Sequence, residues 1–294
     1  MSKPAIAFIG LGNMGGPMAA NLVSAGYTVH GFDVTDIARE KAAEAGVTLH
    51  DSAADAAKDA QIVVTMLPNG RLVRNVLEEC ATGEGKLYVD SSTIGVGEAK
   101  ENAEFLNSTG SRYIDAPVSG GVAGAAAGTL AFMVGGADAD LAEAKDILDV
   151  MGRSTTHCGP VGAGAAAKLC NNMILGVQQI AIAEGLVLGQ RLGLDPQAFF
   201  DVVSNSTGSC WALTTNCPAP GVLGKAPSDN NFEPGFATNL IVKDLGLAMS
   251  EVEATGTEAR LGELASEIYS KLADDGLGAK DFSVVYEQLR ERKA

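Results

Sequence analysis

A glycine-rich turn between an apolar run and a helical pattern constrains this chain more than any other feature. Residues 6–9 form the apolar run, and apolar residues recur at helical spacing over 13–25; between them stands Gly10-Leu11-Gly12-Asn13-Met14-Gly15. A strand, a tight turn and a helix in this order present backbone N–H groups at the positive end of the helix dipole, where phosphate binds. The next strand-like run, residues 28–32, ends at Asp33. This spacing predicts a dinucleotide-binding unit.

The three glycines of the turn are expected to act differently. Gly10 permits the tight turn, Gly12 lets the backbone approach a pyrophosphate, and Gly15 lets the helix pack closely on the strand. The carboxylate of Asp33 can accept hydrogen bonds from both ribose hydroxyls of NAD, and it would repel the 2′-phosphate of NADP. The two residues after Asp33 add no cation, so the sequence favours NAD. The alternative role for Asp33 is a strand-end cap.

Strand-like runs continue to alternate with helical segments as far as residue 160. They cover residues 62–67, 87–90, 112–115 and 130–134. Such alternation predicts βαβ units around a mostly parallel sheet. Beyond Gly162 the pattern is helical, with a long helix expected over 165–192 and shorter ones over 194–204, 240–254 and 261–273. We therefore expect an α/β Rossmann-type domain over residues 1–162 and an all-α domain over residues 163–294, joined by the long helix.

Composition limits the partners of the chain. Thirty-six acidic residues against 21 basic ones give a formal charge of −15, which opposes binding to nucleic acid and to anionic membranes. Five cysteines without a C-x-x-C pair, and only three histidines, give little support to a disulfide framework or a metal site. The first ten residues lack the pattern of a signal peptide. We expect a cytoplasmic protein with no bound metal.

Two groups of polar residues stand in apolar, glycine-rich surroundings. Ser119, Gly120 and Gly121 follow a strand-like run, and a hydroxyl with exposed N–H groups can bind a carboxylate. A plain glycine-rich turn is the alternative. Lys168 and Asn172 share one face near the start of the long helix. A lysine in apolar sequence is commonly a snorkelling residue at a domain edge. If it is buried instead, burial lowers the pKa of a lysine and favours proton exchange near neutral pH.

Two further features have a plain structural interpretation as well as a functional one. Lys243 and Asp244 lie on an otherwise apolar helix, where a surface ion pair is one interpretation. Trp211 is the only tryptophan, and a single tryptophan packs in a core more often than it contacts a ligand.

The order of these motifs resembles the β-hydroxyacid dehydrogenase family. The resemblance runs from residue 6 to about residue 286 and is carried by segments 8–15, 66–68, 90–94, 115–121, 128–130, 162–172 and 243–245. Several motifs in a fixed order are much more specific than one glycine-rich turn. The resemblance implies a Rossmann domain followed by a helical domain, NAD-dependent oxidation of a small β-hydroxyacid, and a homodimer or homotetramer.

The resemblance also implies roles for individual residues. The catalytic lysine corresponds to Lys168, with Asn172 supporting it, and the substrate carboxylate would bind to Ser119, Gly120 and Gly121. Trp211 and Phe236 correspond to aromatic residues on the substrate side. The cofactor contacts correspond to Gly10, Leu11, Gly12, Asn13, Met14, Gly15, Asp33, Leu67, Pro68, Thr93 and Lys243.

Three alternatives remain open on the sequence. The substrate can be any of several hydroxyacids with three or four carbons, because no residue selects among them. A protein that binds NAD without turnover is possible on fold alone, but it has no need for the combination of Lys168, Asn172 and Ser119. A phosphosugar dehydrogenase needs basic residues near the phosphate, and residues 116–137 contain none.

Overall fold

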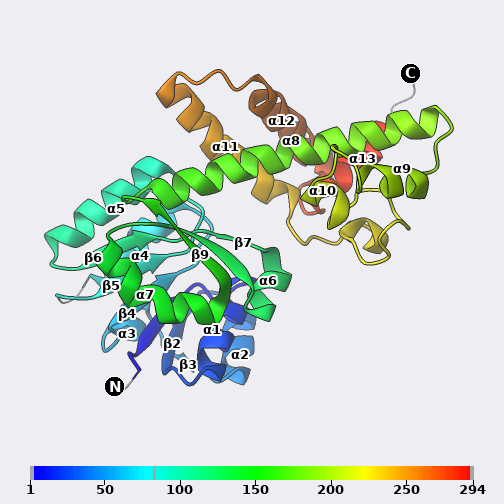
Figure 1. Ribbon diagram of the computed structural model, residues 1–294. Helices are drawn as coiled ribbons and strands as arrows, with labels where there is room; N and C mark the ends of the chain where they lie inside the picture. The colour runs from blue at the N-terminus through cyan, green and yellow to red at the C-terminus, as the bar shows by residue number, and fades with distance from the viewer. Residues whose placement is uncertain (1–2, 82–83, 292–294) are drawn as a thin grey trace. The chain divides into compact units, whose positions relative to one another are not determined.

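A computed structural model describes residues 3–81 and 84–291 of the chain (Figure 1). They divide into two compact units, with the boundary between Lys168 and Leu169. Residues 1, 2, 82, 83 and 292–294 of the two expected domains lie outside the described residues. The predicted fold class, a Rossmann-like α/β domain followed by a helical domain, is confirmed.

The first unit is built on one sheet. Its strands are β1 (Ile6–Ile9), β2 (Val29–Phe32), β3 (Thr48–Leu49), β4 (Ile62–Thr65), β5 (Leu87–Asp90), β6 (Arg112–Asp115), β7 (Val118–Ser119), β8 (Leu130–Gly135) and β9 (Gly152–Gly159). The order is β3-β2-β1-β4-β5-β6-β8-β7, with β9 paired to β8. Strands β1 to β6 run parallel, whereas β8 runs antiparallel to β6 and β7. The predicted mostly parallel sheet is confirmed.

Helices cover both faces of this sheet. They are α1 (Gly15–Ser24), α2 (Asp36–Glu44), α3 (Ala53–Ala57), α4 (Gly70–Cys80), α5 (Val96–Ser108), α6 (Gly121–Ala127) and α7 (Asp138–Met151). Alternate residues of β1 show why two layers are needed, since Ile6 and Phe8 pack on one side and Ala7 and Ile9 on the other. Parallel strands that are buried on both faces are mostly apolar along their whole length. The sequences of β1 and β4 show this pattern, and all their residues are buried.

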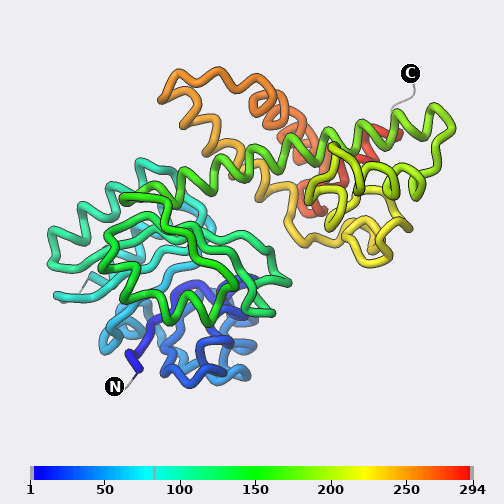
Figure 2. The backbone as a smooth tube through the Cα atoms, in the orientation of Figure 1, coloured from blue at the N-terminus to red at the C-terminus, as the bar shows by residue number. Residues whose placement is uncertain are grey.

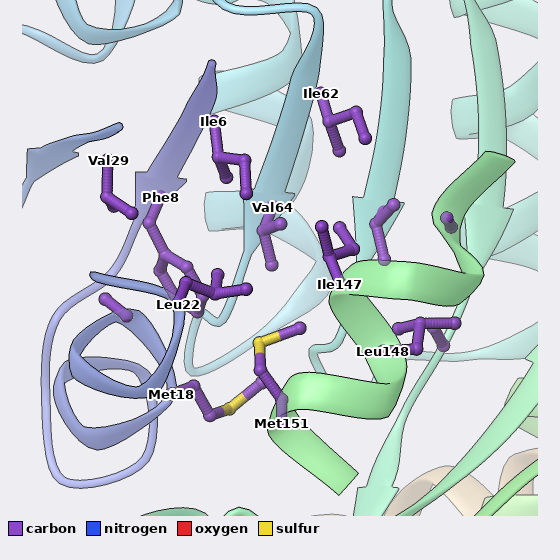
Figure 3. Close-up of a cluster of buried hydrophobic side chains, with 14 of the residues drawn as sticks. Ile6, Phe8, Met18, Leu22, Val29, Ile62, Val64, Ile147, Leu148 and Met151 are labelled. Atoms are coloured by element: carbon purple, nitrogen blue, oxygen red, sulfur yellow. The ribbon is translucent and has the colours of Figure 1, made fainter. Parts of the chain in front are cut away.

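Each layer has its own hydrophobic core. Figure 3 shows the first, in which strand residues meet side chains of α1 and α7, namely Ile6, Phe8, Met18, Leu22, Val29, Ile62, Val64, Ile147, Leu148 and Met151. The second core lies under α3, α4 and α5. Helix α4 begins at a side-chain cap, because Asn69 accepts a hydrogen bond from Leu72 N–H at 3.0 Å. Such a cap stabilises a helix by about 1 kcal/mol.

The second unit is helical. It contains most of α8 (Ala163–Arg191), then α9 (Pro196–Val203), α10 (Trp211–Thr214), α11 (Thr238–Thr255), α12 (Arg260–Leu272) and α13 (Val285–Glu291), with short turns η1 (Pro227–Asn230), η2 (Ala273–Leu277) and η3 (Phe282–Val284). Helices α11 and α12 pack side by side (Figure 2). The core is formed by α8, α11 and α12 with the C-terminal segment, where Tyr269 and Phe282 are fully buried.

Helix α8 is long and apolar enough to cross a membrane by length and composition alone. Half of its most apolar window is buried within the chain, and the core helix of a soluble protein meets the same criterion. The helix is therefore weak support for a membrane span.

Candidate functional site

The carboxyl ends of five strands align along one edge of the sheet. In the register of the parallel pairs, Ile9 aligns with Phe32 and with Thr65, Thr65 aligns with Asp90, and Asp90 aligns with Asp115. The residues after these strands include the glycine-rich turn, Asp33, Leu67, Pro68 and Thr93. The strand order changes direction between β1 and β4, and open α/β sheets bind ligands outside the carboxyl ends at such a point.

The glycine-rich turn shows a separate reason for each of its three glycines. Gly10 has a φ of +94°, and a Cβ there would overlap the carbonyl oxygen of Met66. At Gly15 a Cβ would overlap the carbonyl oxygen of Gly10 and approach Phe8 to 3.0 Å. Gly12 is exposed, and a Cβ there would meet nothing within 4 Å. The backbone is therefore closely packed at Gly10 and Gly15, whereas Gly12 between them faces open space.

Among the described residues, no side chain caps the beginning of α1, where the Gly16 N–H donates to the Gly12 carbonyl oxygen at 2.9 Å. Its N-cap position, Met14, gives no side-chain cap, and the first turn contains no acidic residue. Asn13 beside it is exposed. A helix start of this kind directs N–H groups and a positive dipole end outward, which suits a pyrophosphate. The residues present therefore fit a dinucleotide.

Substitution at two of these glycines separates folding from cofactor binding. Gly15→Ala is expected to cost about 1–3 kcal/mol of stability, because the new methyl group overlaps backbone. Gly12→Ala is expected to leave stability unchanged within about 0.5 kcal/mol but to raise the Kd for NADH about tenfold or more, because the methyl fills the space for the phosphates. Urea denaturation and fluorescence titration with NADH measure both. Gly97→Ala, with open space in α5, is the control, and Gly12→Ala with normal binding would contradict the assignment.

Asp33 ties the second strand to the glycine-rich turn. Its carboxylate accepts a hydrogen bond from Leu11 N–H at 2.7 Å and another from Thr35 N–H at 2.8 Å. Two carboxylate oxygens have about four acceptor positions, so these bonds leave capacity for ribose hydroxyls. Val34, the next residue, is 87% exposed and carries no charge.

A buried network supports the other loops at this edge. Asp90 accepts hydrogen bonds from the hydroxyls of Thr65 at 2.8 Å and Tyr113 at 3.0 Å, and from Ser92 N–H at 3.0 Å. The hydroxyl of Ser92 in turn accepts a bond from Leu67 N–H at 2.9 Å. Burial raises the pKa of Asp90, and these hydrogen bonds oppose the rise. The network fixes the loop of Leu67 and Pro68 and the segment that leads to Thr93. Sequence reasoning did not identify Asp90 as a supporting residue.

Ser119, Gly120 and Gly121 form a turn that only glycine allows. Ser119 ends β7, Gly120 follows with a φ of +138°, and Gly121, with a φ of +62°, is the first residue of α6. Glycine adopts such positive φ values without strain, and the backbone N–H groups of a turn can bind anions. The Ser119 side chain is half-buried and Gly120 is exposed, so the turn is open to a ligand.

Asp115, at the end of β6, bonds to the start of α8. Its Oδ1 accepts a hydrogen bond from Gly162 N–H, and its Oδ2 accepts one from Ala165 N–H, both at 2.7 Å. Burial raises the pKa of Asp115, while the backbone N–H groups act in the opposite direction. The side chain is therefore a cap for the helix that carries Lys168.

Lys168 and Asn172 are both buried on α8, which is continuous from Ala163 to Arg191. Lys168 is 8% exposed and Asn172 is 1% exposed. A lysine that only snorkelled from a domain edge would keep its head group in water, so that alternative fits poorly.

A polar cluster in the second unit surrounds Asn172. The Nδ2 of Asn172 donates to Asp244 Oδ2 at 2.5 Å, and Asn171 Nδ2 donates to Asn172 Oδ1 at 2.9 Å. Lys243 Nζ lies 3.2 Å from Asp244 Oδ1. The Asp244 side chain is only 3% exposed, so the interpretation of Lys243 and Asp244 as a surface ion pair is wrong. Asp244 is a residue of this cluster that sequence reasoning did not assign to the site.

The two aromatic residues differ in their surroundings. Trp211 starts α10 and is 49% exposed, so it is not a core residue. Phe236 packs edge-on against Phe282, with ring centroids 5.6 Å apart. Its backbone N–H and that of Gly235 donate to the buried carboxylate of Asp281 at 2.9 and 3.0 Å.

Among residues 3–81 and 84–291, no group of three or more His, Cys, Asp or Glu side chains is placed to hold a metal ion. The site residues named from the sequence thus fall into two sets. The first unit holds the glycine-rich turn, Asp33, the two supported loops, the Ser119 turn and Lys168. The second unit holds Asn172, Trp211, Phe236 and Lys243.

Two family models match consecutive parts of the chain. The NAD binding domain of 6-phosphogluconate dehydrogenase matches residues 5–159. The NAD-binding domain of NADP-dependent 3-hydroxyisobutyrate dehydrogenase matches residues 162–289. The chain therefore contains NAD(P)-binding domains.

Similar proteins match over nearly their whole length. A probable 3-hydroxyisobutyrate dehydrogenase of Mycobacterium tuberculosis is 52% identical over 289 residues, covering 98% of each chain. The human mitochondrial 3-hydroxyisobutyrate dehydrogenase is 43% identical over 300 residues, covering 99% of this chain and 88% of that one. A solved structure of the Mycobacterium tuberculosis enzyme with L-serine superposes with a TM-score of 0.93 at 51% identity, covering 98% of this chain and 100% of that one. The chain belongs to the 3-hydroxyisobutyrate dehydrogenases of the β-hydroxyacid dehydrogenase family.

Proposed function

We propose that this chain oxidises 3-hydroxyisobutyrate to methylmalonate semialdehyde with NAD, using Lys168 as the general acid/base. The observation that carries the proposal is a lysine only 8% exposed, near the start of α8, in a chain 52% identical to a probable 3-hydroxyisobutyrate dehydrogenase. The reaction is consistent with valine catabolism, and a cytoplasmic location fits the sequence.

The chain's residues bind the substrate and move one proton. Ser119 and the N–H groups of the following glycines hold the substrate carboxylate. As the C–H bond of the hydroxymethyl carbon breaks, its electron pair leaves with the hydrogen as hydride, and the amine of Lys168 takes the hydroxyl proton. The carbon–oxygen double bond forms from the released O–H pair. The cofactor supplies the hydride acceptor when bound.

Asn172 and Asp244 support the reaction by orientation. The 2.5 Å bond from Asn172 to Asp244 fixes the side-chain amide on the helix face that also carries Lys168. A held amide can keep the lysine or the substrate hydroxyl in line without taking part in proton transfer. Lys243, beside Asp244, is proposed to contact the cofactor. Phe236 and Trp211 are proposed to contact the substrate.

NAD is the proposed cofactor because of Asp33 and the uncharged, exposed Val34. A carboxylate beside a 2′-phosphate is a like-charge contact, and no cation in the next residue offsets it. We expect Asp33→Ser to lower kcat/KM for NAD by about ten- to a hundredfold, equal to one lost charged hydrogen bond. The same variant should lower kcat/KM for NADP less or raise it. Asp36→Ser, at the exposed start of α2, is the control, and equal losses with both cofactors would contradict the role.

Rates with a substrate panel test the proposed substrate. The panel is 3-hydroxyisobutyrate, L-serine, glycerate and 6-phosphogluconate, each with NAD and with NADP, followed at 340 nm. We expect kcat/KM for 3-hydroxyisobutyrate with NAD to exceed the others by about tenfold or more. L-Serine is the second candidate, because a structure 51% identical to this chain contains it. A faster rate with serine or glycerate would move the specificity to that acid. Clear NAD binding without turnover on any acid would favour a non-catalytic protein.

A homodimer or homotetramer is proposed as the assembled form. Ile174, Leu188 and Leu192, on or just after α8, are each more than half exposed, at 53%, 59% and 77%. Light scattering at several concentrations measures the mass of the assembly, and a monomer throughout would contradict this part of the proposal.

A further inference from the structure

We propose that Asp115 is a positioning residue that holds Lys168 and the Ser119 turn in one fixed relation. The inference rests on the roles proposed above for Lys168 and Ser119. It concerns a joint inside the first unit, where β6 ends and α8 begins. Asp115 itself is not proposed to contact substrate or cofactor.

The joint lies a few residues from each proposed functional group. Asp115 is four residues before Ser119 along the chain, and its carboxylate bonds to Ala165, three residues before Lys168. Residues three apart in a helix lie on the same face. A shift of the helix start therefore moves the lysine amine directly, and a shift of the β6 end moves the turn that would bind the carboxylate.

The bonds of Asp115 set both the axial position and the rotation of α8. Its two oxygens bond to N–H groups at different points of the first turn, Gly162 and Ala165, each at 2.7 Å. One bond would leave the helix start free to pivot about it, whereas two bonds restrict that movement. A carboxylate at a helix N-terminus also interacts favourably with the dipole. These contacts give the helix a charged, two-point attachment to the sheet.

Two glycines leave room for this carboxylate. A Cβ at Gly135 would lie 2.5 Å from Asp115 Oδ1, and a Cβ at Gly164 would lie 2.9 Å from Asp115 Oδ2. Gly135 is the partner of Asp115 in the antiparallel pairing of β6 with β8. Side chains at either position would displace the carboxylate, so the backbone on both sides is closely fitted to it. Asp115 is buried, with 1% of its surface exposed.

The test compares Asp115→Asn with a matched acid at another helix start, Asp138→Asn. Asparagine has the same shape but turns an NH₂ group toward one of the two N–H donors, so one bond is lost. Asp138 begins α7 and is 94% exposed, so its variant should behave as wild type. In Asp115→Asn we expect kcat to fall by about tenfold or more while the Kd for NADH stays within about twofold.

Two further readouts separate positioning from a general loss of structure. Hydrogen exchange should accelerate in the segment 160–168 and stay unchanged in α7 (Asp138–Met151), because only the former contains the released N–H groups. In a Lys168→Ala background with added ethylamine, Asp115→Asn should lower kcat by a smaller factor than it does in the wild-type background, because the lysine it positions is gone and only its effect on the Ser119 turn remains. Asp115→Ser, a smaller side chain that can still cap a helix, repeats the test if the asparagine variant does not fold.

Each alternative result overturns the inference. An Asp115→Asn enzyme with kcat within about twofold of wild type would show that the joint does not position the lysine. Faster exchange throughout the first unit, with weaker NADH binding, would assign Asp115 to stability alone. If the wild-type chain oxidises no acid of the panel, the proposed function fails, and hydrogen exchange over 160–168 still decides whether Asp115 holds the helix.

Discussion

Lys168→Ala is expected to lower kcat for 3-hydroxyisobutyrate by about 10²- to 10⁴-fold, the usual contribution of a positioned general acid/base. Lys168 is the buried cation on α8, and removing its amine leaves the hydroxyl proton without an acceptor. The Kd for NADH should stay within about twofold of wild type, because the glycine-rich turn and Asp33 are untouched. Initial rates at 340 nm and NADH fluorescence titration give the two quantities.

A matched lysine provides the control for this experiment. Lys145 lies on α7 in the same unit, is 60% exposed and pairs only at the surface with Asp149. Lys145→Ala should keep kcat within about twofold, since exposed ion pairs contribute little. A Lys168→Ala enzyme with kcat near wild type would remove the lysine from the mechanism, whatever the control shows.

Asp281→Ala is expected to cost about 3–5 kcal/mol of stability, because several buried donors lose their acceptor at once and each unsatisfied donor costs about 1–3 kcal/mol. Asp281 is fully buried, and its carboxylate accepts hydrogen bonds from N–H groups of Gly235, Phe236 and Ser283, from the Ser283 hydroxyl and from Asn216. Alanine leaves these donors without an acceptor in a site that water does not reach. Urea denaturation measures the free energy of unfolding.

The same substitution also tests how the segment before α11 is held. Asp274→Ala removes an exposed acid from the same C-terminal segment and should change the free energy of unfolding by no more than about 0.5 kcal/mol. A loss below about 1 kcal/mol in Asp281→Ala would mean that the donors find other partners. The start of α11 would then be held by packing rather than by this carboxylate.

Local patterns in the sequence predicted the regular part of the fold. The runs at 87–90 and 112–115 form β5 and β6 with the expected bounds. A short apolar or alternating run between helical segments is typical of a buried strand. Strand β9, Gly152–Gly159, was missed because its residues are polar and none of them is buried. It is held by its pairing with β8, a long-range contact that no local pattern shows.

The supporting residues of the site could not be predicted for a related reason. Asp115 meets Gly162 and Ala165 across 47 and 50 positions of sequence, and Asp281 meets Phe236 across 45. In the sequence, Asp244 follows Lys243 on an apolar helix, a pattern that is compatible with a surface ion pair. In the structure its side chain is buried and bonded to Asn172. Residue type and spacing identify groups that could react, whereas the acids that hold them depend on tertiary contacts.

Transfer of an isotope label tests the central claim most directly. The substrate is 3-hydroxyisobutyrate with two deuterium atoms on the hydroxymethyl carbon, and the reduced cofactor is analysed by mass spectrometry after turnover with NAD. We expect one deuterium in the cofactor, one retained in the aldehyde, and a primary isotope effect on the hydride-transfer step. Reduced cofactor without deuterium, or no reduced cofactor while NAD binds, would contradict hydride transfer from this carbon.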